Sequence, residues 1–591
     1  MSKLDITVEV CGMAGDGTIA AGGLINEGMS RGGLSVLAFD SYPAEIRGFG
    51  RCVTRSRIGH ERRTALEEHT HVLISLNDEQ SLSRVPFLTD LSAVFFDNRP
   101  PAPVPEESSL AAHVEPTTAL FGMPFSDLAA QAAGSDRGRN LVALGGFAAV
   151  FQVPSELFQQ AIVKKFKSKG QKVVESNVRC FQAGYAYAQE RFSERLRDPI
   201  SFPPRKEGPD IVMLSGNTAI AEGALDAGLH LYFGYPITPA TPIMEYLAKK
   251  LPERGGRLMQ MEDEIASIGA VLGGFFAGKR SMTATSGPGF ALMTELITHG
   301  VMSETPAVIV DAQRGGPATG LPTKTEQSDL HAAVFGGPGD SARIVIAPTD
   351  VLECYHLTMK SFQLAEKYQI PVIVLTDFFL DNRVESVPPP VAGDGDGKDM
   401  TVYPDPDAKE PYRRFKITES GVSPRALPGM EGYIFTATGL EHTEKGLPDY
   451  TPENHSKMTE KRYRKLRSAL EDLPSPVEQA PVGRMDLGVV GWGSNFGSVH
   501  EAVNRACERG LKVGALKLTS IYPYHEDAIR DFMSRCDEVL IAELNFEGQL
   551  ANLIGHLHRK EVIRLNRVTG LPMPPSVIYK KILEILGETD S

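Results

Sequence analysis

The sequence lacks the closely spaced cysteines that bind metal clusters. Its 591 residues include six cysteines, and no two of them form a C-x-x-C pair: Cys11, Cys52, Cys180, Cys354, Cys507 and Cys536. Structural zinc and iron–sulfur sites draw most of their ligands from such pairs. We therefore expect free thiols, most of them buried, and no metal site in this chain. Any redox cluster that the protein uses must lie in another chain.

Three further absences limit the partners and the location of the protein. Lysine and arginine number 61 against 74 aspartate and glutamate, which gives a formal net charge of −13 and no basic stripe. Nucleic acid is therefore not an expected partner, because it binds to cationic surfaces. No apolar run reaches the roughly 18 residues of a membrane-spanning helix. The first residues lead straight into a strand, without the apolar core of a signal peptide, so the sequence predicts a cytoplasmic protein.

The chain does contain a repeated alternation of strand-like and helix-like segments, which is typical of α/β folds. Its length predicts about three or four domains. A charged and then proline-rich stretch at 191–209 indicates a linker, and 386–480 indicates an extended connection with one helix near 453–473. The predicted regions are therefore α/β at 1–190, a linker at 191–209, α/β at 210–385, a connection at 386–480 and a compact α/β region at 481–591.

The first region opens with a strand, a glycine-rich turn and a helix. Residues 4–10 alternate as a strand does, and the turn that follows holds Gly15, Asp16, Gly17 and Thr18. Backbone N–H groups in such a turn, together with the helix N-terminus, favour a bound anion such as a phosphate. The third glycine of the dinucleotide fingerprint is missing at the expected spacing, so NAD is not predicted.

A second strand, 35–39, leads into a glycine-rich loop that carries Tyr42 and Arg47. These two side chains are suited to a phosphorylated ligand. The alternative is a loop held together by its own Arg–Glu ion pair. The residues alone leave both interpretations open.

The second α/β region carries a proline-flanked threonine at the end of a strand. The run is Tyr235-Pro236-Ile237-Thr238-Pro239. Its prolines fix the backbone on both sides of Thr238 and direct its hydroxyl away from the strand end. Ligands of open α/β sheets bind at strand ends of this kind.

Three acids, Glu262, Asp263 and Glu264, stand directly before an apolar helix that is rich in small residues. The helix dipole favours acids in a first turn whatever the protein does, which accounts for two of the three. A strand then leads into a Thr-Ser-Gly-Pro-Gly turn that begins at Thr285, where backbone N–H groups can approach a ligand. The residues alone leave open whether the third acid has a chemical role.

A long loop rich in glycine and proline, 312–325, follows the strand 307–311. It has one arginine, Arg314, near its root. The planar guanidinium group is suited to binding a carboxylate through two parallel hydrogen bonds. The alternative is that Arg314 pins its own loop.

In this order, the Tyr-Pro-Ile-Thr-Pro run, the acid-headed helix, the Thr-Ser-Gly-Pro-Gly turn and the Gln-Arg-x-Gly-Pro-x-Thr-Gly-x-Pro-Thr loop resemble the 2-oxoacid:ferredoxin oxidoreductases. Within that family the chain is most similar to the α subunit of 2-oxoglutarate:ferredoxin oxidoreductases, and its N-terminal region resembles the family's γ subunit fused ahead of α. The resemblance covers essentially the whole chain and is weakest at 386–480. It implies a γ-like α/β domain, a thiamine-diphosphate-binding domain of the pyrimidine type and a transketolase C-terminal-like α/β domain.

The resemblance also implies a reaction and its partners. The reaction is oxidative decarboxylation of 2-oxoglutarate to succinyl-CoA with ferredoxin as electron acceptor, or the reverse reductive carboxylation. Pyruvate, a branched-chain oxoacid or an aryl pyruvate is the alternative substrate. Thiamine diphosphate would be shared with a β subunit that holds Mg²⁺ and a [4Fe–4S] cluster, coenzyme A would be a substrate, and the assembly would be (αβ)₂.

Thiamine enzymes bind the diphosphate and Mg²⁺ through a Gly-Asp-Gly motif followed by an asparagine. Gly15-Asp16-Gly17 has no such asparagine after it, and Gly393-Asp394-Gly395 lies in a polar linker with no strand before it. Neither is expected to bind a metal, so this chain would supply the aminopyrimidine half of the site. The missing motif disfavours a transketolase-like enzyme that acts alone. An inactive binding scaffold is disfavoured because Glu264, Thr238 and Arg314 are present together.

Matched position by position, the resemblance assigns roles to individual residues. It selects Glu264, with Glu262 as the alternative, as the acid that hydrogen-bonds the aminopyrimidine and activates the cofactor. Substrate binding falls to Thr238, Arg314 and Thr323, with Arg314 on a carboxylate. The residues assigned to the cofactor are Tyr235, Pro236, Ile237, Glu264, Thr285, Ser286 and Gly287. The residues assigned to coenzyme A are Gly15, Asp16, Gly17, Thr18, Tyr42 and Arg47.

The helix behind Glu264 presents small residues that allow another backbone to approach. They are Gly269, Ala270, Gly273, Gly274, Ala277 and Gly278. Because thiamine sites form between domains, this surface is expected to contact the β subunit. The alternative is close packing within this chain.

Overall fold

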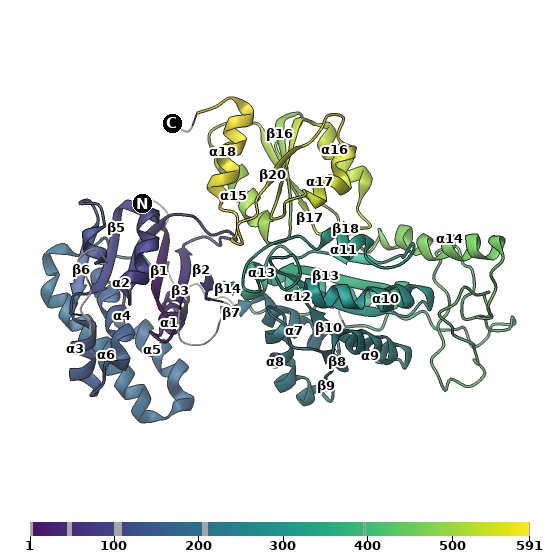
Figure 1. The fold of residues 1–591 in the computed structure, drawn as a ribbon, viewed down its shortest axis with the longest axis horizontal. Helices are drawn as coiled ribbons and strands as arrows, with labels where there is room; N and C mark the ends of the chain where they lie inside the picture. Colours follow the sequence, from purple (N-terminus) through teal and green to yellow (C-terminus); the bar gives the residue numbers. More distant parts are fainter. Residues whose placement is uncertain are drawn as a thin grey trace. The chain divides into compact units, whose positions relative to one another are not determined.

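The structure, a computed structural model, describes residues 4–43, 50–99, 109–203, 211–393, 395 and 397–589. It divides into two compact units (Figure 1). The first unit comprises the residues up to Leu214 together with Arg383–Pro389, and the second comprises Ser215–Asn382 together with the residues from Pro390 onward. No helix in the described part of the chain is both long enough and apolar enough to cross a membrane.

The first unit is built on an eight-stranded mixed sheet with the order β6-β5-β4-β1-β3-β2-β14-β7. The central strand β1 pairs in parallel with β4 and antiparallel with β3, so the sheet changes direction there. Its strands are β1 (Asp5–Met13), β2 (Ser35–Ser41), β3 (Arg51–Gly59), β4 (Thr70–Ser75), β5 (Leu88–Asp97), β6 (Ala119–Met123), β7 (Val212–Ser215) and β14 (Val384–Val387).

Helices cover this sheet and include one unusually close helix pair. A Cβ atom added at Gly145 on α4 would lie 2.1 Å from the carbonyl oxygen of Phe181 on α6, and one at Gly184 would lie 2.0 Å from that of Val142. Facing glycines therefore let the two backbones touch. The helices are α1 (Thr18–Arg31), α2 (Asp78–Ser81), α3 (Phe125–Ala133), α4 (Arg139–Val150), α5 (Ser155–Phe166) and α6 (Gln171–Arg191).

One strand differs from the sequence expectation. The strand at 211–217, expected to open the second α/β region, is β7, and it lies at the edge of the first sheet beside β14. Its apolar pattern predicts a strand but not the sheet that it joins. The chain supplies the neighbouring strand only when it returns much later, at Val384–Val387.

The second unit contains a seven-stranded sheet with the order β18-β12-β13-β11-β10-β8-β9, parallel except for the edge strand β18. Every residue of β11 and β13 is buried, as in central strands with helices on both faces. The strands are β8 (Leu231–Gly234), β9 (Arg257–Gln260), β10 (Ser281–Thr285), β11 (Ala307–Gln313), β12 (Ile344–Ile346), β13 (Pro371–Asp377) and β18 (Ser520–Tyr522). The helices are α7 (Gly216–Asp226), α8 (Thr241–Lys250), α9 (Glu264–Phe276), α10 (Gly287–Met302), α11 (Leu330–Phe335), α12 (Val351–Tyr368) and α13 (Phe378–Asn382).

A five-stranded sheet with the order β15-β17-β16-β19-β20 completes the second unit. Apolar side chains of α15 and α18 cover one face of this sheet. In Figure 1, α15 is coloured yellow-green and α18 yellow. The strands are β15 (Val477–Gln479), β16 (Met485–Trp492), β17 (Val513–Leu518), β19 (Cys536–Glu543) and β20 (Ile563–Asn566). The helices are α15 (Phe496–Glu508), α16 (Glu526–Ser534), α17 (Gln549–Ile554) and α18 (Pro575–Leu586).

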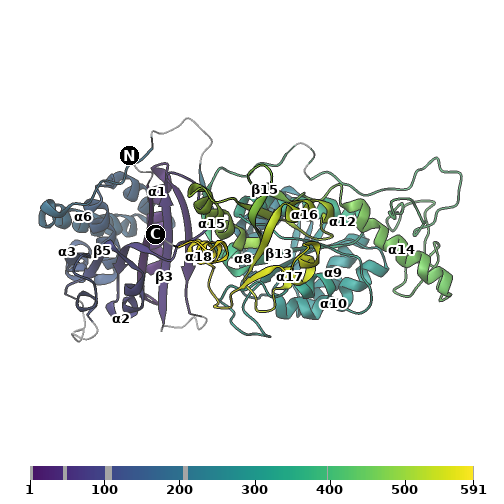
Figure 2. The same cartoon turned by 90° about the horizontal axis from the view of Figure 1, so that it is seen from above.

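A long connection precedes this sheet, and its described residues between β14 and α14 (Pro452–Ala469) form neither helix nor strand (Figure 2). Buried charges hold it in place. Glu304, after α10, forms ion pairs with Lys461 and with Lys465, the latter at 2.6 Å, and its carbonyl oxygen accepts a hydrogen bond from Arg414 at 2.7 Å. Burial raises the pKa of the Glu304 carboxyl, but the three cations outweigh it and hold that pKa far below its usual value.

A second buried ion pair holds the start of the connection. The guanidinium of Arg280 donates to both carboxylate oxygens of Glu366 at 2.7 Å. It also donates to the carbonyl oxygens of Gly397 at 2.6 Å and Lys398 at 2.7 Å. The connection is therefore fixed by planar, multidentate contacts that only arginine provides.

Candidate active site

Four neighbouring parallel strands of the second unit, β11, β10, β8 and β9, end at the same edge of their sheet. Each leads into a predicted site segment: 235–238 after β8, Glu264 after β9, 285–287 at the end of β10 and Arg314 after β11. Carboxyl ends of parallel strands are where open α/β sheets bind ligands. The fold thus gathers at one edge residues that are far apart in the sequence.

The three acids before α9 have three different environments. Asp263 is the N-cap residue, and its carboxylate accepts a hydrogen bond from the backbone N–H of Ala266 at 2.7 Å. Glu262 is exposed. Glu264 is the first residue of the helix and is 7% exposed. The cap at Asp263 therefore sets the start of the helix so that Glu264 turns inward.

The Glu264 carboxylate lies against the first turn of α10. A Cβ atom added at Gly289 would lie 2.5 Å from Glu264 Oε1 and 2.2 Å from the hydroxyl oxygen of Thr285, so only glycine leaves room for both groups. Within the described part of the chain, no hydrogen bond or ion pair engages the Glu264 carboxylate. A buried carboxylate of this kind is suited to an N–H donor from a ligand, such as the protonated ring nitrogen of an aminopyrimidine.

Within the described chain, one buried hydroxyl group without a partner lies at the end of β10, on Ser286. Thr285 and Ser286 are buried, and the Ser286 hydroxyl has no hydrogen-bond partner among the described residues. A Cβ atom at Gly287 would lie 2.5 Å from Oδ2 of Asp329. The backbone of this turn is therefore in close contact with an acid from the loop after β11.

Arg314 is joined to the predicted substrate threonine. One of its terminal nitrogens donates to the carbonyl oxygen of Thr238 at 2.6 Å. Its side chain is buried, and its Nε lacks a hydrogen-bond partner within the described ranges. Burial lowers the pKa of the Arg314 guanidinium, and the charge of Asp329 opposes that effect. Thr323 is half-buried on the same loop, which folds back on itself through a 2.9 Å bond from Gly315 N–H to the carbonyl of Lys324.

The sequence reasoning gave no role to two acids at this edge. Asp311, the fifth residue of β11, is fully buried, and neither carboxylate oxygen has a hydrogen-bond partner in the part of the chain that the structure describes. Burial and the charges of Asp329 and Asp381 raise the pKa of Asp311 well above its usual value. For Asp329, burial and the charge of Glu326 raise the pKa to about 6. An acid near the end of an otherwise apolar strand was the available signal for Asp311.

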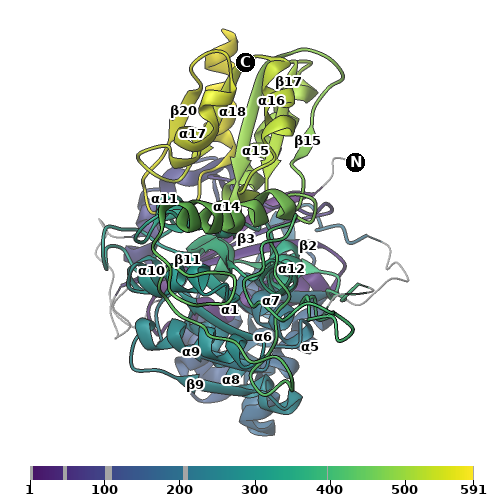
Figure 3. The same ribbon diagram turned by 90° about the vertical axis from the view of Figure 1, so that its right-hand side faces the viewer.

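The small-residue helix α9 packs beside α10 (Figure 3), and its glycines fall into two groups. A Cβ atom at Gly274 would lie 2.1 Å from the hydroxyl oxygen of Ser281, and one at Gly278 would lie 2.5 Å from the Leu427 side chain. Gly273 has no neighbour within 4 Å, and Gly269 has only Leu296, at 3.5 Å. Gly274 and Gly278 thus serve packing within the chain, whereas Gly269 and Gly273 remain open.

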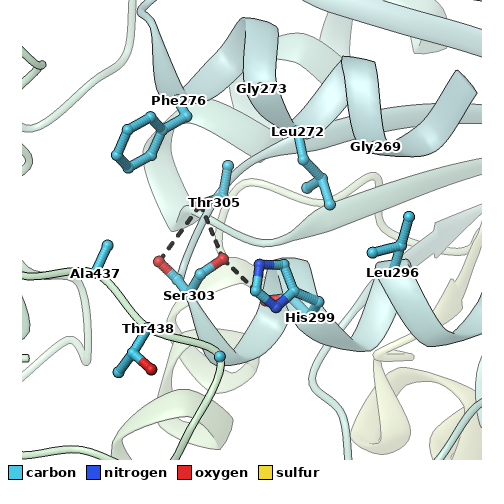
Figure 4. A pocket seen from close by; sticks show the side chains of 11 residues that line it. Gly269, Leu272, Gly273, Phe276, Leu296, His299, Ser303, Thr305, Ala437 and Thr438 are labelled. Atoms are coloured by element: carbon cyan, nitrogen blue, oxygen red, sulfur yellow. Dashed lines mark hydrogen bonds between the residues drawn. The ribbon is translucent and has the colours of Figure 1, made fainter. Parts of the chain in front are cut away.

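The open glycines line a cavity of about 370 Å³ between α9, α10 and the connection (Figure 4). Leu272 and Phe276 of α9 and Leu296 of α10 give it an apolar wall, and His299 and Ser303 lie at its other side. The cavity therefore lies along α9, the helix that begins with Glu264.

In the first unit, the glycine-rich turn joins β1 to α1. Gly15 and Gly17 have positive φ angles, 103° and 82°, which suit glycine. The Asp16 carboxylate accepts a 2.8 Å hydrogen bond from the backbone N–H of Met13 and forms an ion pair with Arg139. The Thr18 hydroxyl is buried without a hydrogen-bond partner among the described residues. Asp16 therefore closes the turn, while Thr18 remains available at the N-terminus of α1.

The two other residues predicted to bind coenzyme A are Tyr42 and Arg47. Tyr42 is half-buried directly after β2, and burial together with the charge of Asp40 raises the pKa of its hydroxyl. Arg47 lies outside the described residues, as does Asp394 of the second Gly-Asp-Gly run. The assignment of this region to coenzyme A stays a prediction.

The described ranges contain no group of three or more His, Cys, Asp or Glu side chains arranged to hold a metal ion. Cys507 is exposed, the other five cysteines are buried, and no disulfide joins any of them in the described ranges.

Family models match the chain in three places. Residues 7–187 match pyruvate ferredoxin/flavodoxin oxidoreductase, and residues 222–461 match the thiamine-diphosphate-binding domain of pyruvate flavodoxin/ferredoxin oxidoreductase. Residues 485–572 match core domain II of pyruvate:ferredoxin oxidoreductase. The three matches correspond to the three α/β regions, each of which contains one of the three sheets.

Curated relatives and a solved structure extend these matches. A 2-oxoglutarate synthase subunit KorA of Methanocaldococcus jannaschii is 37% identical over 63% of this chain and 99% of its own length. The α subunit of 2-oxoacid:ferredoxin oxidoreductase 2 of Aeropyrum pernix is 32% identical over 83% of this chain and 80% of its own. A structure of 2-oxoglutarate:ferredoxin oxidoreductase from Magnetococcus marinus, with 2-oxoglutarate, coenzyme A and succinyl-CoA bound, matches 99% of this chain and 100% of its own at 37% identity and a TM-score of 0.92. The chain belongs to the 2-oxoacid:ferredoxin oxidoreductase family, as an α subunit with a fused N-terminal oxidoreductase domain.

Proposed function

We propose that this chain is the α subunit, with a fused γ domain, of a CoA-acylating 2-oxoglutarate:ferredoxin oxidoreductase. In the oxidative direction, 2-oxoglutarate, coenzyme A and two oxidised ferredoxins give succinyl-CoA, CO₂, two reduced ferredoxins and a proton. The end-to-end similarity to the Magnetococcus marinus enzyme supports the substrate class. The observation that carries the proposal is the buried, unpaired Glu264 carboxylate at an edge that also presents Arg314.

The residues at this edge fit an aminopyrimidine and an oxoacid. Bound thiamine diphosphate supplies the electron sink that decarboxylation requires. Glu264 holds a proton at the aminopyrimidine ring nitrogen, because it is a rigidly placed carboxylate with no competing donor. Arg314 binds a carboxylate of the oxoacid, and its hydrogen bond to the Thr238 carbonyl fixes the direction of the guanidinium. The other predicted site residues form the walls around these groups: Tyr235, Pro236, Ile237, Thr285, Ser286, Gly287 and Thr323.

A β subunit would supply the diphosphate site, Mg²⁺ and the [4Fe–4S] cluster, in an (αβ)₂ assembly. The cysteine spacing of this chain, which includes no C-x-x-C pair, is the reason for placing the cluster in another chain. The outward face of α9 and α10 is proposed as the contact surface. It exposes Ile265, Phe276 and Leu292 at 47%, 40% and 51% beside the open Gly269 and Gly273.

Substitution of Ile265 by lysine tests this surface. The charge should abolish co-purification of the β subunit while the folded α chain keeps its circular dichroism spectrum. Val482→Lys is the matched control, because Val482 is fully exposed in the turn before β16. Unchanged co-purification of the Ile265 variant would place the interface elsewhere.

Coenzyme A is proposed to bind beside the glycine-rich turn of the first unit. Gly15 and Gly17 allow close approach of the backbone, and Thr18 offers an unpaired hydroxyl at the N-terminus of α1. Tyr42 and Arg47 complete the proposed set. Thr18→Val should raise the KM for coenzyme A and leave the KM for the oxoacid unchanged.

The central experiment is reconstitution with the β subunit and an assay of viologen reduction with coenzyme A and a panel of 2-oxoacids. Glu264→Gln should assemble normally and lose activity by about 100-fold or more, because glutamine cannot take the ring proton. Arg314→Ala should raise the KM for 2-oxoglutarate at least tenfold, by about 1.4 kcal/mol or more, and leave that for coenzyme A unchanged. Near-normal turnover of the Glu264 variant would refute the proposed mechanism, and preference for pyruvate would assign the alternative substrate.

A further inference from the structure

Asp329 occupies a helix N-cap position without capping the helix. It precedes α11, and its side chain accepts no hydrogen bond from that helix. The N-cap aspartates of α9 and α12, Asp263 and Asp350, both accept one from a backbone N–H three residues on. The Asp329 carboxylate therefore does not cap α11, although aspartate is favoured at N-cap positions because its carboxylate can accept such a bond.

The carboxylate is held instead between the ends of β10 and β11. A Cβ atom at Gly287 would lie 2.5 Å from Oδ2 and 2.9 Å from Oδ1 of Asp329, so glycine is needed to admit it. The backbone N–H of Asp329 donates to Gln313 Oε1 at 3.0 Å, and Gln313 Nε2 donates to the Thr376 carbonyl at 2.9 Å. One hydrogen bond thus joins the Asp329 backbone to Gln313, which a second bond anchors on β13, and no hydrogen bond engages the Asp329 carboxylate among the described residues.

Three charged groups face Asp329. Arg314 and Glu326 act on it directly, and its own charge acts on the buried Asp311. The first turn of α10 contributes no acid, and the nearest ionisable side chain of α11, His331, faces Glu547 at 3.8 Å. Asp329 is also the charged group that acts on Arg314, although the two do not form a contact ion pair.

We propose that Asp329 controls the affinity of the Arg314 site for the oxoacid carboxylate. A neutral Asp329 leaves the full charge of Arg314 to the substrate, and an ionised Asp329 offsets part of that charge. Asp329 acts through Arg314 and is a positioning residue, not a catalytic one. The inference rests on the carboxylate-binding role proposed for Arg314.

The direction of the pH dependence follows from the surroundings of Asp329. Burial and the charge of Glu326 raise the pKa of Asp329 to about 6, against the opposing effect of Arg314. The side chain is therefore neutral near pH 5 and ionised near pH 8, whereas carboxylates in solution are ionised throughout this range. The KM for 2-oxoglutarate should rise as the pH rises through about 6, and binding near that pH should take up a proton.

The test uses the reconstituted αβ enzyme at about pH 5.5 to 8.5 with 2-oxoglutarate, coenzyme A and methyl viologen. The wild type should show a KM that rises about three- to tenfold across this range, with a smaller change in kcat. Asp329→Asn should hold the lower KM at every pH. Calorimetry with glutarate in two buffers of different ionisation enthalpy should show proton uptake in the wild type and none in Asp329→Asn.

Two variants make the test specific. Asp350→Asn is the matched control, because it makes the same substitution at an N-cap that does cap its helix, and it should keep the wild-type pH profile. Glu326→Gln leaves Asp329 in place and removes one of the charges that raise its pKa, so the rise in KM should move to lower pH.

A wild-type pH profile and proton uptake in Asp329→Asn would overturn the inference. If the Asp329 variant fails to assemble, Glu326→Gln provides the test. An unshifted pH dependence of its KM for 2-oxoglutarate would then overturn the inference. If Arg314→Ala leaves the KM for 2-oxoglutarate unchanged, the proposed carboxylate site itself is wrong. If Arg314→Ala raises that KM and Asp329→Asn changes nothing, only the role of Asp329 is wrong.

Discussion

Replacing Gly289 by alanine should displace the Glu264 carboxylate without removing any functional group. The new Cβ atom would lie 2.5 Å from Glu264 Oε1 and 2.2 Å from the Thr285 hydroxyl oxygen. Ordinary van der Waals contact begins near 3.4 Å, so the carboxylate must move by about 1 Å. A misplacement of about 1 Å lowers enzymatic rates by about 100-fold, which is the expected loss in kcat.

The stability of the Gly289 variant should change much less than its activity. Overpacking costs about 1–3 kcal/mol, and replacing a helical glycine by alanine returns about 0.5–1 kcal/mol. Gly28→Ala on α1 is the matched control, because its added Cβ would meet Phe158 at an ordinary 3.5 Å. The assay is viologen reduction by the reconstituted enzyme, together with thermal unfolding of the full chain.

A double variant separates displacement of the carboxylate from general damage. Glu264→Ala removes both Oε1 and Cγ, the two atoms of Glu264 that the Gly289 methyl group would meet, at 2.5 and 2.7 Å. Adding Gly289→Ala to Glu264→Ala should therefore lower the residual kcat much less than the 100-fold expected in the wild-type background, by about tenfold or less. Gly289→Ala activity within about threefold of wild type would refute the placement of Glu264 against α10.

Three further predictions concern buried charges. Glu304→Gln should lower the free energy of unfolding in urea by about 3–5 kcal/mol, because it leaves buried lysines without their anion. Arg280→Lys should lower it by about 2–4 kcal/mol in the same assay, because lysine cannot span both oxygens of Glu366 and the neighbouring carbonyls. Asp329 has a raised pKa, so its stabilising neutral form is present below about pH 4 and is lost as the pH rises through about 6. Asp329→Asn should therefore gain stability over wild type by about 2 kcal/mol at pH 8 and little at pH 4, as measured by thermal unfolding.

The sequence identified the family and the fold class because these depend on local motifs in a fixed order. The four predicted site segments lie at one edge of a sheet, and their roles stay predictions. Glu264 is instructive, because the residues alone left Glu262 open and only the resemblance chose between them. The structure supplies a physical reason: Asp263 caps α9, so the next residue turns inward while Glu262 faces solvent. The assignment of a catalytic role to Glu264 stays a prediction.

Contacts between distant segments could not be predicted in the same way. Asp329 and Gly287 are far apart in the sequence, and nothing local indicates that the glycine makes room for the acid. The strand at 211–217 has an ordinary apolar pattern, and its sheet is decided by a partner strand that begins only at Val384. Periodicity predicts elements, but the contacts between them depend on the whole fold.

The small residues of α9 show the same limit at a single helix. Their shared pattern predicts a close approach on one surface, yet Gly274 approaches the Ser281 side chain of this chain while Gly273 faces open space. A helix presents residues one position apart about 100° from each other, so neighbouring glycines serve different surfaces. Close packing within the chain therefore accounts for Gly274 and Gly278, whereas a contact of Gly269 and Gly273 with the β subunit stays a prediction.

The charges at the site edge indicate where the choice of substrate lies. The buried cation described at this edge is Arg314. The acids at this edge are Glu264, Asp311, Asp329 and Glu326. One guanidinium suits one carboxylate, so the second carboxylate of 2-oxoglutarate and the diphosphate require cations from elsewhere. The β subunit is the proposed source.

Pairing this α chain with the β subunit of a pyruvate-specific relative should therefore lower the kcat/KM ratio of 2-oxoglutarate to pyruvate by about 100-fold, which corresponds to about 2.7 kcal/mol for one lost charge-assisted contact. The hybrid is assayed with both oxoacids in the viologen assay, and the native αβ pair is the control. A hybrid that keeps the native preference would show that the α chain alone selects the substrate, and that a cation at this edge other than Arg314 binds the second carboxylate.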